Sequence, residues 1–368
     1  MGGSNDCTLV NRGDLNRYMT LSIEPNTATA LSQTYNSDLT LKDILKTLPK
    51  EVFTKDSRKA WQQAVSTILM VSLGMTALAF SPWYLLPLAW VFTGTAMTGC
   101  FVIGHDCAHR SFSNSRKVND IVGHLFMLTL IYPFHGWRYG HNKHHKHTNK
   151  MEVDNAWQPW QPEAYATAPT WLQIVYQAMR GRLWWLASLP HWAAVHFDWR
   201  KFPEGKTRDD VKFSALFVVI GAAVIFPILF ATIGVWGFIK FWLMPWLVYH
   251  FWMSTFTIVH HTAADIPFKP ANKWQEAIAQ LTGTVHCDYP RWVEFLCHDI
   301  NVHIPHHISV AIPSYRLREA HAIIKANWGE YIKERKFTWE MMKDITDKCH
   351  IYEENEFYQS FSEFNDRN

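Results

Sequence analysis

Two long stretches of this chain contain almost no charged side chains, and they limit its fold more than any other feature. From Trp61 to Gly104 there is no Asp, Glu, Lys or Arg, and from Phe213 to Ala264 the one such residue is Lys240. A membrane-spanning helix needs about 20 apolar residues, so each stretch is long enough for two passes. Soluble cores do not contain charge-free runs of this length. The sequence therefore predicts a polytopic, all-α membrane protein.

Each stretch divides at a turn, which gives four predicted transmembrane helices in two hairpins. The turns lie at Ser81-Pro82-Trp83 and near Gly234. The predicted spans are residues 61–80, 84–103, 214–233 and 236–257. Both turns lack Lys and Arg, which apart from Lys240 are confined to the other three segments of the chain: 1–60, 105–212 and 265–368. By the positive-inside rule these three segments face the cytoplasm.

The remaining segments are predicted to lie outside the bilayer core. Residues 1–40 are polar, so we expect a disordered tail followed by a single integral-membrane domain over residues 41–368. Leu41–Lys50 is predicted to be an amphipathic helix at the membrane surface. Two apolar segments, Ile121–Phe134 and Leu183–Phe197, are too short to span comfortably. We interpret them as interfacial helices, with a fifth and sixth pass as the alternative, and the C-terminal segment as a helical cap.

Three histidine motifs carry the chemistry of the sequence. The first, at 105–109, reads HxxxH, and the motifs at 141–145 and 303–307 read HxxHH. On a helix, residues i, i+3 and i+4 share one face, so each motif can direct its imidazoles at one point. The eight side chains are His105, His109, His141, His144, His145, His303, His306 and His307. Imidazole binds iron, copper, zinc and nickel, and eight ligands are too many for one ion. A surface patch is the alternative for one HxxxH motif, but three motifs together predict two metal ions held close together.

Other cysteines and histidines are expected to be structural. The six cysteines lack CxxC spacing and are predicted to be reduced thiols. Cys107 lies in the first motif but points away from its histidines at helical spacing, so we expect it to pack. His147 lies at the wrong angle to join the second motif. Eight more histidines lack motif spacing and are interpreted as interfacial or packing residues: His124, His135, His191, His196, His250, His286, His321 and His350.

The motifs resemble those of the membrane fatty acid desaturase family. HDCAHRSF at 105–112, HNKHHKHTN at 141–149 and HDINVHIPHH at 298–307 look most like cyanobacterial acyl-lipid desaturases of the Δ12 type. The resemblance covers most of the chain and implies four transmembrane helices with a cytoplasmic helical cap that holds a non-haem di-iron centre. It implies O₂-dependent conversion of an oleoyl to a linoleoyl chain on a glycerolipid, with reduced ferredoxin as electron donor. It also implies a plasma or thylakoid membrane location with the motifs on the cytoplasmic side, and no nucleic-acid partner.

The same resemblance implies a ninth ligand near the cytoplasmic end of the fourth helix. His261 is favoured because it precedes Thr262, as the family's histidine does in a Gln-His-Thr stretch, and His260 then replaces the glutamine. In distant animal members an asparagine one turn earlier contacts the metal through water. Thr257 stands there in this chain, a departure that leaves a tenth contact open.

Metal-binding histidines need partners that fix their tautomer. The sequence offers five candidates close to the motifs: Asp106, Asp154, His298, Asp299 and Asn301. His298 is alternatively a ligand itself, because it lies five residues before His303.

The residues are consistent with oxidative lipid chemistry. Removing hydrogen from an unactivated methylene needs O₂ and a redox metal, a role that zinc cannot fill. The apolar hairpins can provide a dry channel for a lipid tail. An ω3 desaturase, a fatty acid hydroxylase, an alkane monooxygenase and a carotenoid oxygenase share this chemistry and remain alternatives. A histidine-rich metal transporter is a further alternative, although it should carry ionisable groups at mid-bilayer, where this chain has only Lys240. The many cytoplasmic Lys and Arg residues can steer an acidic carrier such as ferredoxin to the enzyme.

Overall fold

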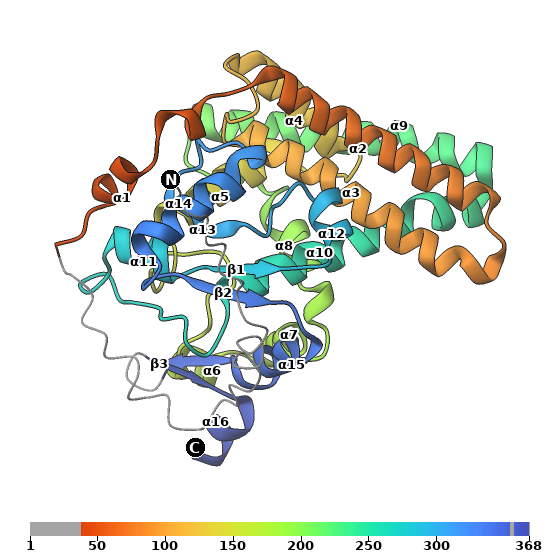
Figure 1. Cartoon of the computed structure of the whole chain (residues 1–368). Coiled ribbons are helices and arrows are strands. Elements are labelled where there is room, and N and C mark those ends of the chain that lie inside the picture. The colour runs from red at the N-terminus through yellow and green to blue at the C-terminus, as the bar shows by residue number, and fades with distance from the viewer. Residues whose placement is uncertain (1–37, 354–356, 368) are drawn as a thin grey trace, which may run out of the picture. The chain divides into compact units, whose positions relative to one another are not determined.

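The structure, a computed structural model, describes residues 38–353 and 357–367, and within them the chain is mostly helical (Figure 1). Residues 1–37, which make up nearly all of the predicted disordered tail and include Cys7, lie outside the described residues. Two small sheets accompany the helices, so the predicted all-α class is corrected to a mostly helical fold. Strands of three or four residues are too short to give a recognisable alternation in the sequence.

The described residues form α-helices that range from short segments to long apolar ones. Those up to residue 195 are α1 (Leu41–Thr47), α2 (Ser57–Phe80), α3 (Leu86–Ala108), α4 (Arg116–Leu128), α5 (Phe134–Lys146), α6 (Pro162–Thr167), α7 (Thr170–Arg180) and α8 (Ser188–Val195). Those that follow are α9 (Lys206–Phe238), α10 (Met244–His261), α11 (Glu276–Thr282), α12 (Arg291–Leu296), α13 (His303–Ile308), α14 (Leu317–Trp328), α15 (Trp339–Lys348) and α16 (Phe361–Arg367). A π-helical turn, Ile239–Leu243, joins α9 to α10.

The four strands form two separate pairs. Strands β1 (Val285–Asp288) and β2 (Lys333–Lys336) are parallel, with His286 opposite Glu334 in the register. Strands β3 (Ile351–Glu353) and β4 (Phe357–Gln359) are antiparallel.

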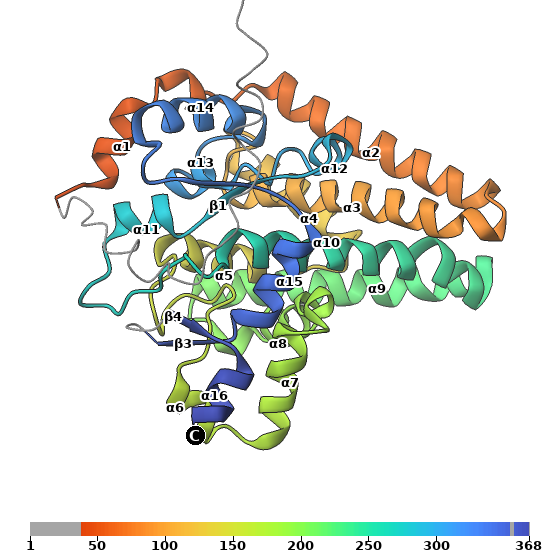
Figure 2. The ribbon, with the colours of Figure 1, turned by 60° about the horizontal axis from the view of Figure 1, so that its bottom comes forward.

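Three helical stretches of the described residues are long and apolar enough to cross a membrane: Ser57–Phe80, Trp83–Ala108 and Lys206–His261. Figure 2 shows α2, α3 and α9 projecting in one direction, away from α1, α11 and α14. Large apolar side chains on α2 and α9 are more than half exposed, among them Ile68, Leu69, Ile220 and Ile228. Such faces are costly in water but suit contact with lipid.

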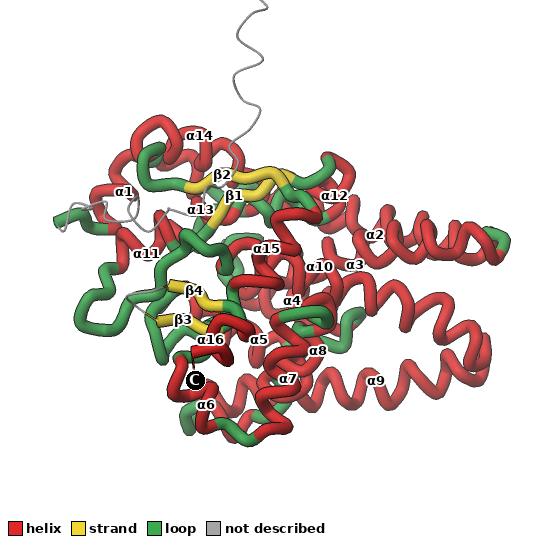
Figure 3. Tube along the Cα trace, turned by 90° about the horizontal axis from the view of Figure 1, so that it is seen from below, coloured by secondary structure: helices red, strands yellow, loops and turns green. Residues whose placement is uncertain are grey.

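The third stretch is interrupted at Gly234, where the sequence predicts a turn. Gly234 has a φ of 67° and a ψ of −177°, a conformation that glycine adopts at little cost. The chain reverses there, as Figure 3 shows for the far end of α9. The Phe226 ring accordingly lies 5.2 Å from the ring of Phe238 and 4.7 Å from that of Trp242.

Helix α3 is the central helix and packs against α2, α4 and α10. Its contact with α10 depends on Gly94, because a Cβ at this position would lie 2.4 Å from Val248 Cβ and 2.5 Å from the Pro245 carbonyl oxygen. The two backbones therefore approach closely. This close packing joins α3, which has His105 in its last turn, to α10, which ends at His261.

The segments predicted to be interfacial form short helices. Residues 121–134 contribute the second half of α4 and the first residue of α5, and residues 183–197 form a 3-10 turn followed by α8. None of them is among the stretches long enough to cross a membrane within the described residues. The N-terminal helix α1 is capped by Thr40 and Asp43. Its apolar residue Ile44 is fully buried in a cluster with Ile304 and Ile324, so this side chain packs against the protein.

We predict that Gly94→Val destabilises the protein by about 1–3 kcal/mol, because the added side chain overpacks the α3–α10 contact. The midpoint of thermal unfolding in detergent measures the effect. Ala79→Val adds the same kind of bulk at an exposed position of α2 and should leave the midpoint unchanged. Equal midpoints for the two variants would contradict the close packing of α3 on α10.

Candidate metal centre

The predicted ligand histidines lie at the ends of helices. His105 lies in the last turn of α3, and His109 follows as its C-cap residue. His144 and His145 lie in the last turn of α5, and His261 is the last residue of α10. The partial negative charge at a helix C-terminus stabilises a nearby cation. Three separate helices therefore contribute both imidazoles and a favourable field to one region.

Five of the nine histidines form a first group: His105, His109, His141, His145 and His306. One ring nitrogen of each lies within 4.8 Å of those of all the others. The Nε2 atoms of His105 and His306 are 2.9 Å apart, and so are those of His141 and His145. Helices α3, α5 and α13 thus meet at one point although their motifs are far apart in the sequence.

The other four histidines form a second group beside the first. His144, His261 and His307 have ring nitrogens within 4.8 Å of one another. The Nε2 atom of His303 lies 3.1 Å from that of His261 and 3.0 Å from that of His307. The ring centroids of His145 and His307 are 4.3 Å apart, which places the two groups side by side. All nine histidines predicted to be ligands are therefore brought together.

The spacing of these nitrogens fits shared metal ions. Two nitrogens bound at right angles to one ion at about 2.1 Å would be about 3.0 Å apart. Several ring nitrogens in the groups are buried without a hydrogen-bond partner among the described residues, including both nitrogens of His109. Buried polar atoms normally have partners, so the arrangement suits bound ions better than the protein alone.

Burial also keeps the imidazoles neutral. Desolvation by burial holds the pKa well below its usual range in His109, His141, His145, His303, His306 and His307, and the neighbouring imidazoles lower it further. A neutral imidazole offers a lone pair, which is the form that binds a metal.

Two of the five predicted orienting residues contact ligand histidines. The Asp154 carboxylate accepts a hydrogen bond from His144 Nδ1 at 2.7 Å. It also accepts from the backbone N–H groups of Asn149 and Ala156, which hold it in place. Because His144 uses its Nδ1–H there, its Nε2 lone pair faces the second group. Asp106 lies 3.3 Å from His105 Nδ1 and accepts from the Ser314 backbone N–H.

The other three predicted orienting residues have different partners. His298 Nε2 lies 2.6 Å from Thr67 Oγ1 on α2, outside both groups. Asp299 accepts from Arg318, and Asn301 donates to the Cys287 carbonyl oxygen and to Glu294. Their contacts connect the loop before α13 to its surroundings.

Three residues near the histidines were missed by sequence reasoning. Gln280, buried on α11, accepts from His307 Nδ1 at 3.1 Å. The Thr148 hydroxyl lies 3.1 Å from the same nitrogen. Trp137 stacks on His141 with ring centroids 4.2 Å apart. Trp137 and Thr148 lie close to the second motif in the sequence, which is only a weak indication that they contact its histidines. Nothing in the sequence connects Gln280 to His307.

The structure also shows the contacts of His260 and Thr257, which lie close to the predicted ninth ligand in the sequence. His260 does not join either group but stacks on His303 with ring centroids 4.2 Å apart. Thr257, the position where the resemblance leaves a tenth contact open, accepts a hydrogen bond at 2.7 Å from the indole N–H of Trp157 and donates one at 2.6 Å to the Met253 carbonyl oxygen. The five described cysteines, Cys107 among them, are buried free thiols.

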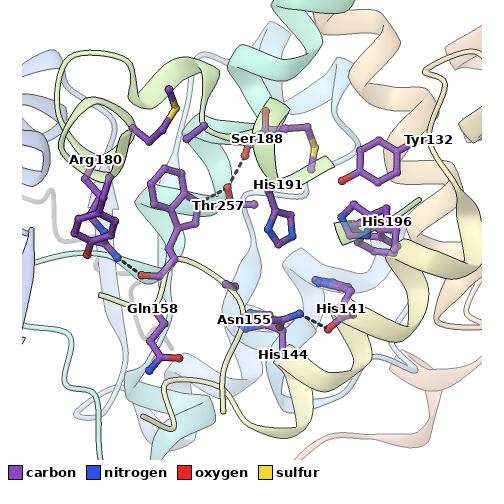
Figure 4. Close-up of a pocket in the computed structure, with 18 residues that line it drawn as sticks. Tyr132, His141, His144, Asn155, Gln158, Arg180, Ser188, His191, His196 and Thr257 are labelled. Atoms are coloured by element: carbon purple, nitrogen blue, oxygen red, sulfur yellow. Dashed lines mark hydrogen bonds between the residues drawn. The ribbon is translucent and has the colours of Figure 1, made fainter. Parts of the chain in front are cut away.

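A cavity of about 320 Å³ lies next to the histidines. Its wall includes His141 and His144, and most of the rest is apolar, as with Trp137, Trp157 and Met253. Figure 4 shows His141 and His144 along one side of the cavity, with Arg180 towards one end and Tyr132 and His196 towards the other. The cavity can hold a slender apolar ligand in contact with the centre.

Comparison with known proteins agrees with this geometry. A family model described as fatty acid desaturase matches residues 81–339. The sn-1 oleoyl-lipid 12-desaturase of Anabaena variabilis is 61% identical over 331 residues, which cover 89% of this chain and 94% of that protein. The protein of the same name from Synechocystis is 55% identical over 346 residues, or 93% and 98% of the two chains. The chloroplastic omega-6 fatty acid desaturase of Arabidopsis thaliana is 52% identical over 324 residues, or 88% and 72%.

We predict that Asp154→Asn lowers the metal affinity of the centre by about 10–100-fold, because His144 loses its charged hydrogen-bond partner. Metal content after titration with a chelator measures the change. Asp344→Asn is the matched control, since Asp344 pairs with Lys348 at the surface of α15. Wild-type metal retention in Asp154→Asn would remove Asp154 from the support of the centre.

Proposed function

Because the chain belongs to the fatty acid desaturase family, we propose that it is an acyl-lipid Δ12 desaturase that converts oleoyl to linoleoyl chains esterified to a glycerolipid. The observation that carries the proposal is the cavity, which brings an apolar lining into contact with His141 and His144 of the candidate centre. The position of the double bond rests on the cyanobacterial relatives that are named oleoyl-lipid 12-desaturases.

The reaction removes two hydrogens from neighbouring methylenes. O₂ takes up four electrons and four protons to give two water molecules. Two electrons and two protons come from the acyl chain as the carbon–carbon double bond forms. Two further electrons come from a one-electron carrier, with two protons from solvent. The reaction therefore requires an external reductant, for which we propose reduced ferredoxin.

The nine histidines would hold two iron ions. The first group supplies His105, His109, His141, His145 and His306, and the second supplies His144, His261, His303 and His307. Iron, when bound, supplies the redox change needed to activate O₂, which zinc does not offer. Asp154, Asp106 and Gln280 orient the imidazoles through their Nδ1 atoms.

The protein would position the acyl chain and exclude water. The cavity has an apolar surface formed in part by Trp137, Trp157 and Met253. A hydrocarbon chain that binds to this surface displaces water from it. The hydrogen bond from Trp157 to Thr257 fixes the indole in the wall. Because the outcome depends on which methylene lies next to the ions, a fixed wall helps to select the carbon that reacts.

We propose the predicted four-span arrangement for the membrane. One hairpin is α2 with α3, and the other is α9 with α10, which reverses at Gly234. The centre lies where α3 and α10 end. The Lys and Arg residues outside the hairpins would place this end on the cytoplasmic side of a cyanobacterial plasma or thylakoid membrane, where they can attract an acidic ferredoxin.

Expression in a host that makes oleoyl lipids but no linoleate tests the proposed reaction. We predict a new cis-Δ12 diene in the membrane lipids, detected by mass spectrometry after derivatisation of the double bonds. A product with the new double bond elsewhere, or a hydroxylated chain, would contradict the proposed regiochemistry. No product from iron-loaded protein supplied with ferredoxin would contradict the desaturase assignment for this substrate.

Substitution of single histidines tests the proposed ligand set. Replacement by alanine should abolish activity, because the loss of one ligand alters the ions' surroundings, at each of His105, His144, His145, His303, His306 and His307. His147→Ala is the matched control, because His147 lies beside the second motif but in neither group, and it should retain activity. Full activity in any of the six variants would remove that residue from the centre.

A further inference from the structure

A second type of histidine cluster lies outside the candidate metal centre. One ring nitrogen each of His286 and His321 and a carboxylate oxygen of Glu334 lie within 4.8 Å of one another. These residues come from β1, α14 and β2, and none of them belongs to the nine histidines of the candidate centre. From the sequence, both histidines are interpreted as interfacial or packing residues because neither has motif spacing.

The parallel pairing of β1 with β2 creates the cluster. His286 and Glu334 are direct partners in the register, so their side chains lie on the same face of the sheet. Asp288 is two residues beyond His286 and shares that face, and its carboxylate lies 3.2 Å from His286 Nε2. His321 reaches the face from α14, with its Nε2 atom 2.7 Å from Glu334 and its ring centroid 4.3 Å from that of His286.

Both imidazoles are buried and incompletely bonded. His286 is 6% exposed and His321 is 7% exposed. The Nδ1 atom of each has no hydrogen-bond partner among the described residues. Other buried histidines of the chain, such as His135 and His250, also have an unpaired ring nitrogen, but the described residues bring two imidazoles and a carboxylate within 4.8 Å of one another at this cluster.

The neutral imidazoles and the Glu334 carboxylate favour a bound cation, whereas the nearby Lys325 ammonium opposes it. Burial lowers the pKa of His321, which favours the neutral, metal-binding form of its ring. Although burial acts to raise it, hydrogen bonds from Lys325 and His321 hold the pKa of Glu334 below its usual value. The Lys325 ammonium binds the second carboxylate oxygen of Glu334 and opposes any added positive charge. Its removal should therefore strengthen cation binding.

We propose that His286, His321 and Glu334 form a binding site for a divalent metal ion, best matched by Zn²⁺, in which Asp288 orients His286 through its Nε2 atom. Two imidazoles and one carboxylate, with water in the fourth position, are a tetrahedral ligand set that zinc accepts. The site would join β1, β2 and α14 at one point. Helix α13, which carries the third histidine motif, packs against both β1 and α14. The ion would therefore brace the framework that holds His303, His306 and His307.

Metal analysis of the purified full-length protein in detergent tests the proposal. The protein is equilibrated with Zn²⁺, freed of loosely bound metal and analysed for zinc and iron per chain. Because zinc could also enter the nine-histidine centre, the zinc content of each variant is compared with that of the wild type. His321→Gln should hold about one zinc ion per chain less than the wild type, since it loses a ligand. Its iron content should be unchanged.

Two further variants keep the test decisive if His321→Gln does not fold. Asp288 is largely exposed, so Asp288→Asn should fold and should bind zinc more weakly by about 10-fold or more. Lys325→Gln keeps every ligand and should bind zinc more tightly than the wild type. Equal zinc content and affinity in the wild type, Asp288→Asn and Lys325→Gln would overturn the proposal and leave His321, Glu334 and Lys325 as a hydrogen-bonded group without metal.

Discussion

Nine imidazoles that face one another, eight of them buried and that of His141 partly buried, are the constraint on which the rest of this structure depends. A buried polar group without a partner costs about 1–3 kcal/mol, and here several ring nitrogens meet other ring nitrogens at about 3 Å. Bound cations would satisfy these lone pairs together. Metal binding would then contribute directly to the stability of the folded chain, because the ligands come from segments that meet only in the folded state.

The long helices explain how distant segments reach one place. Helices α3 and α10 pack closely through Gly94, and their ends deliver His105 and His261. Helices α5 and α13 supply six more imidazoles, and His109 follows α3 as its C-cap residue. The apolar cavity opens beside α5. The same packing that buries the centre therefore also places a hydrocarbon-sized space against it. The proposed iron centre and the proposed acyl site therefore depend on one arrangement of helices.

Much of this could be predicted from the sequence, because the informative patterns are local. Charge-free runs predict apolar helices, and HxxHH spacing predicts that the histidines share one face of a helix. The contact of His307 with Gln280 and the pairing of His286 with Glu334 could not be predicted, since each joins residues that meet only through tertiary packing. The short strands were missed for the same reason, because β1 and β2 are distant in sequence and carry no clear alternation.

We propose that the nine histidines hold two iron ions in one centre. Mössbauer spectroscopy of protein loaded with ⁵⁷Fe tests it most directly, because it reports the number, oxidation state and coupling of the iron sites. We expect two non-haem iron ions per chain, both bound mainly by nitrogen, and magnetic coupling between them in the oxidised state because they lie close together. A single uncoupled iron site per fully loaded chain would contradict it.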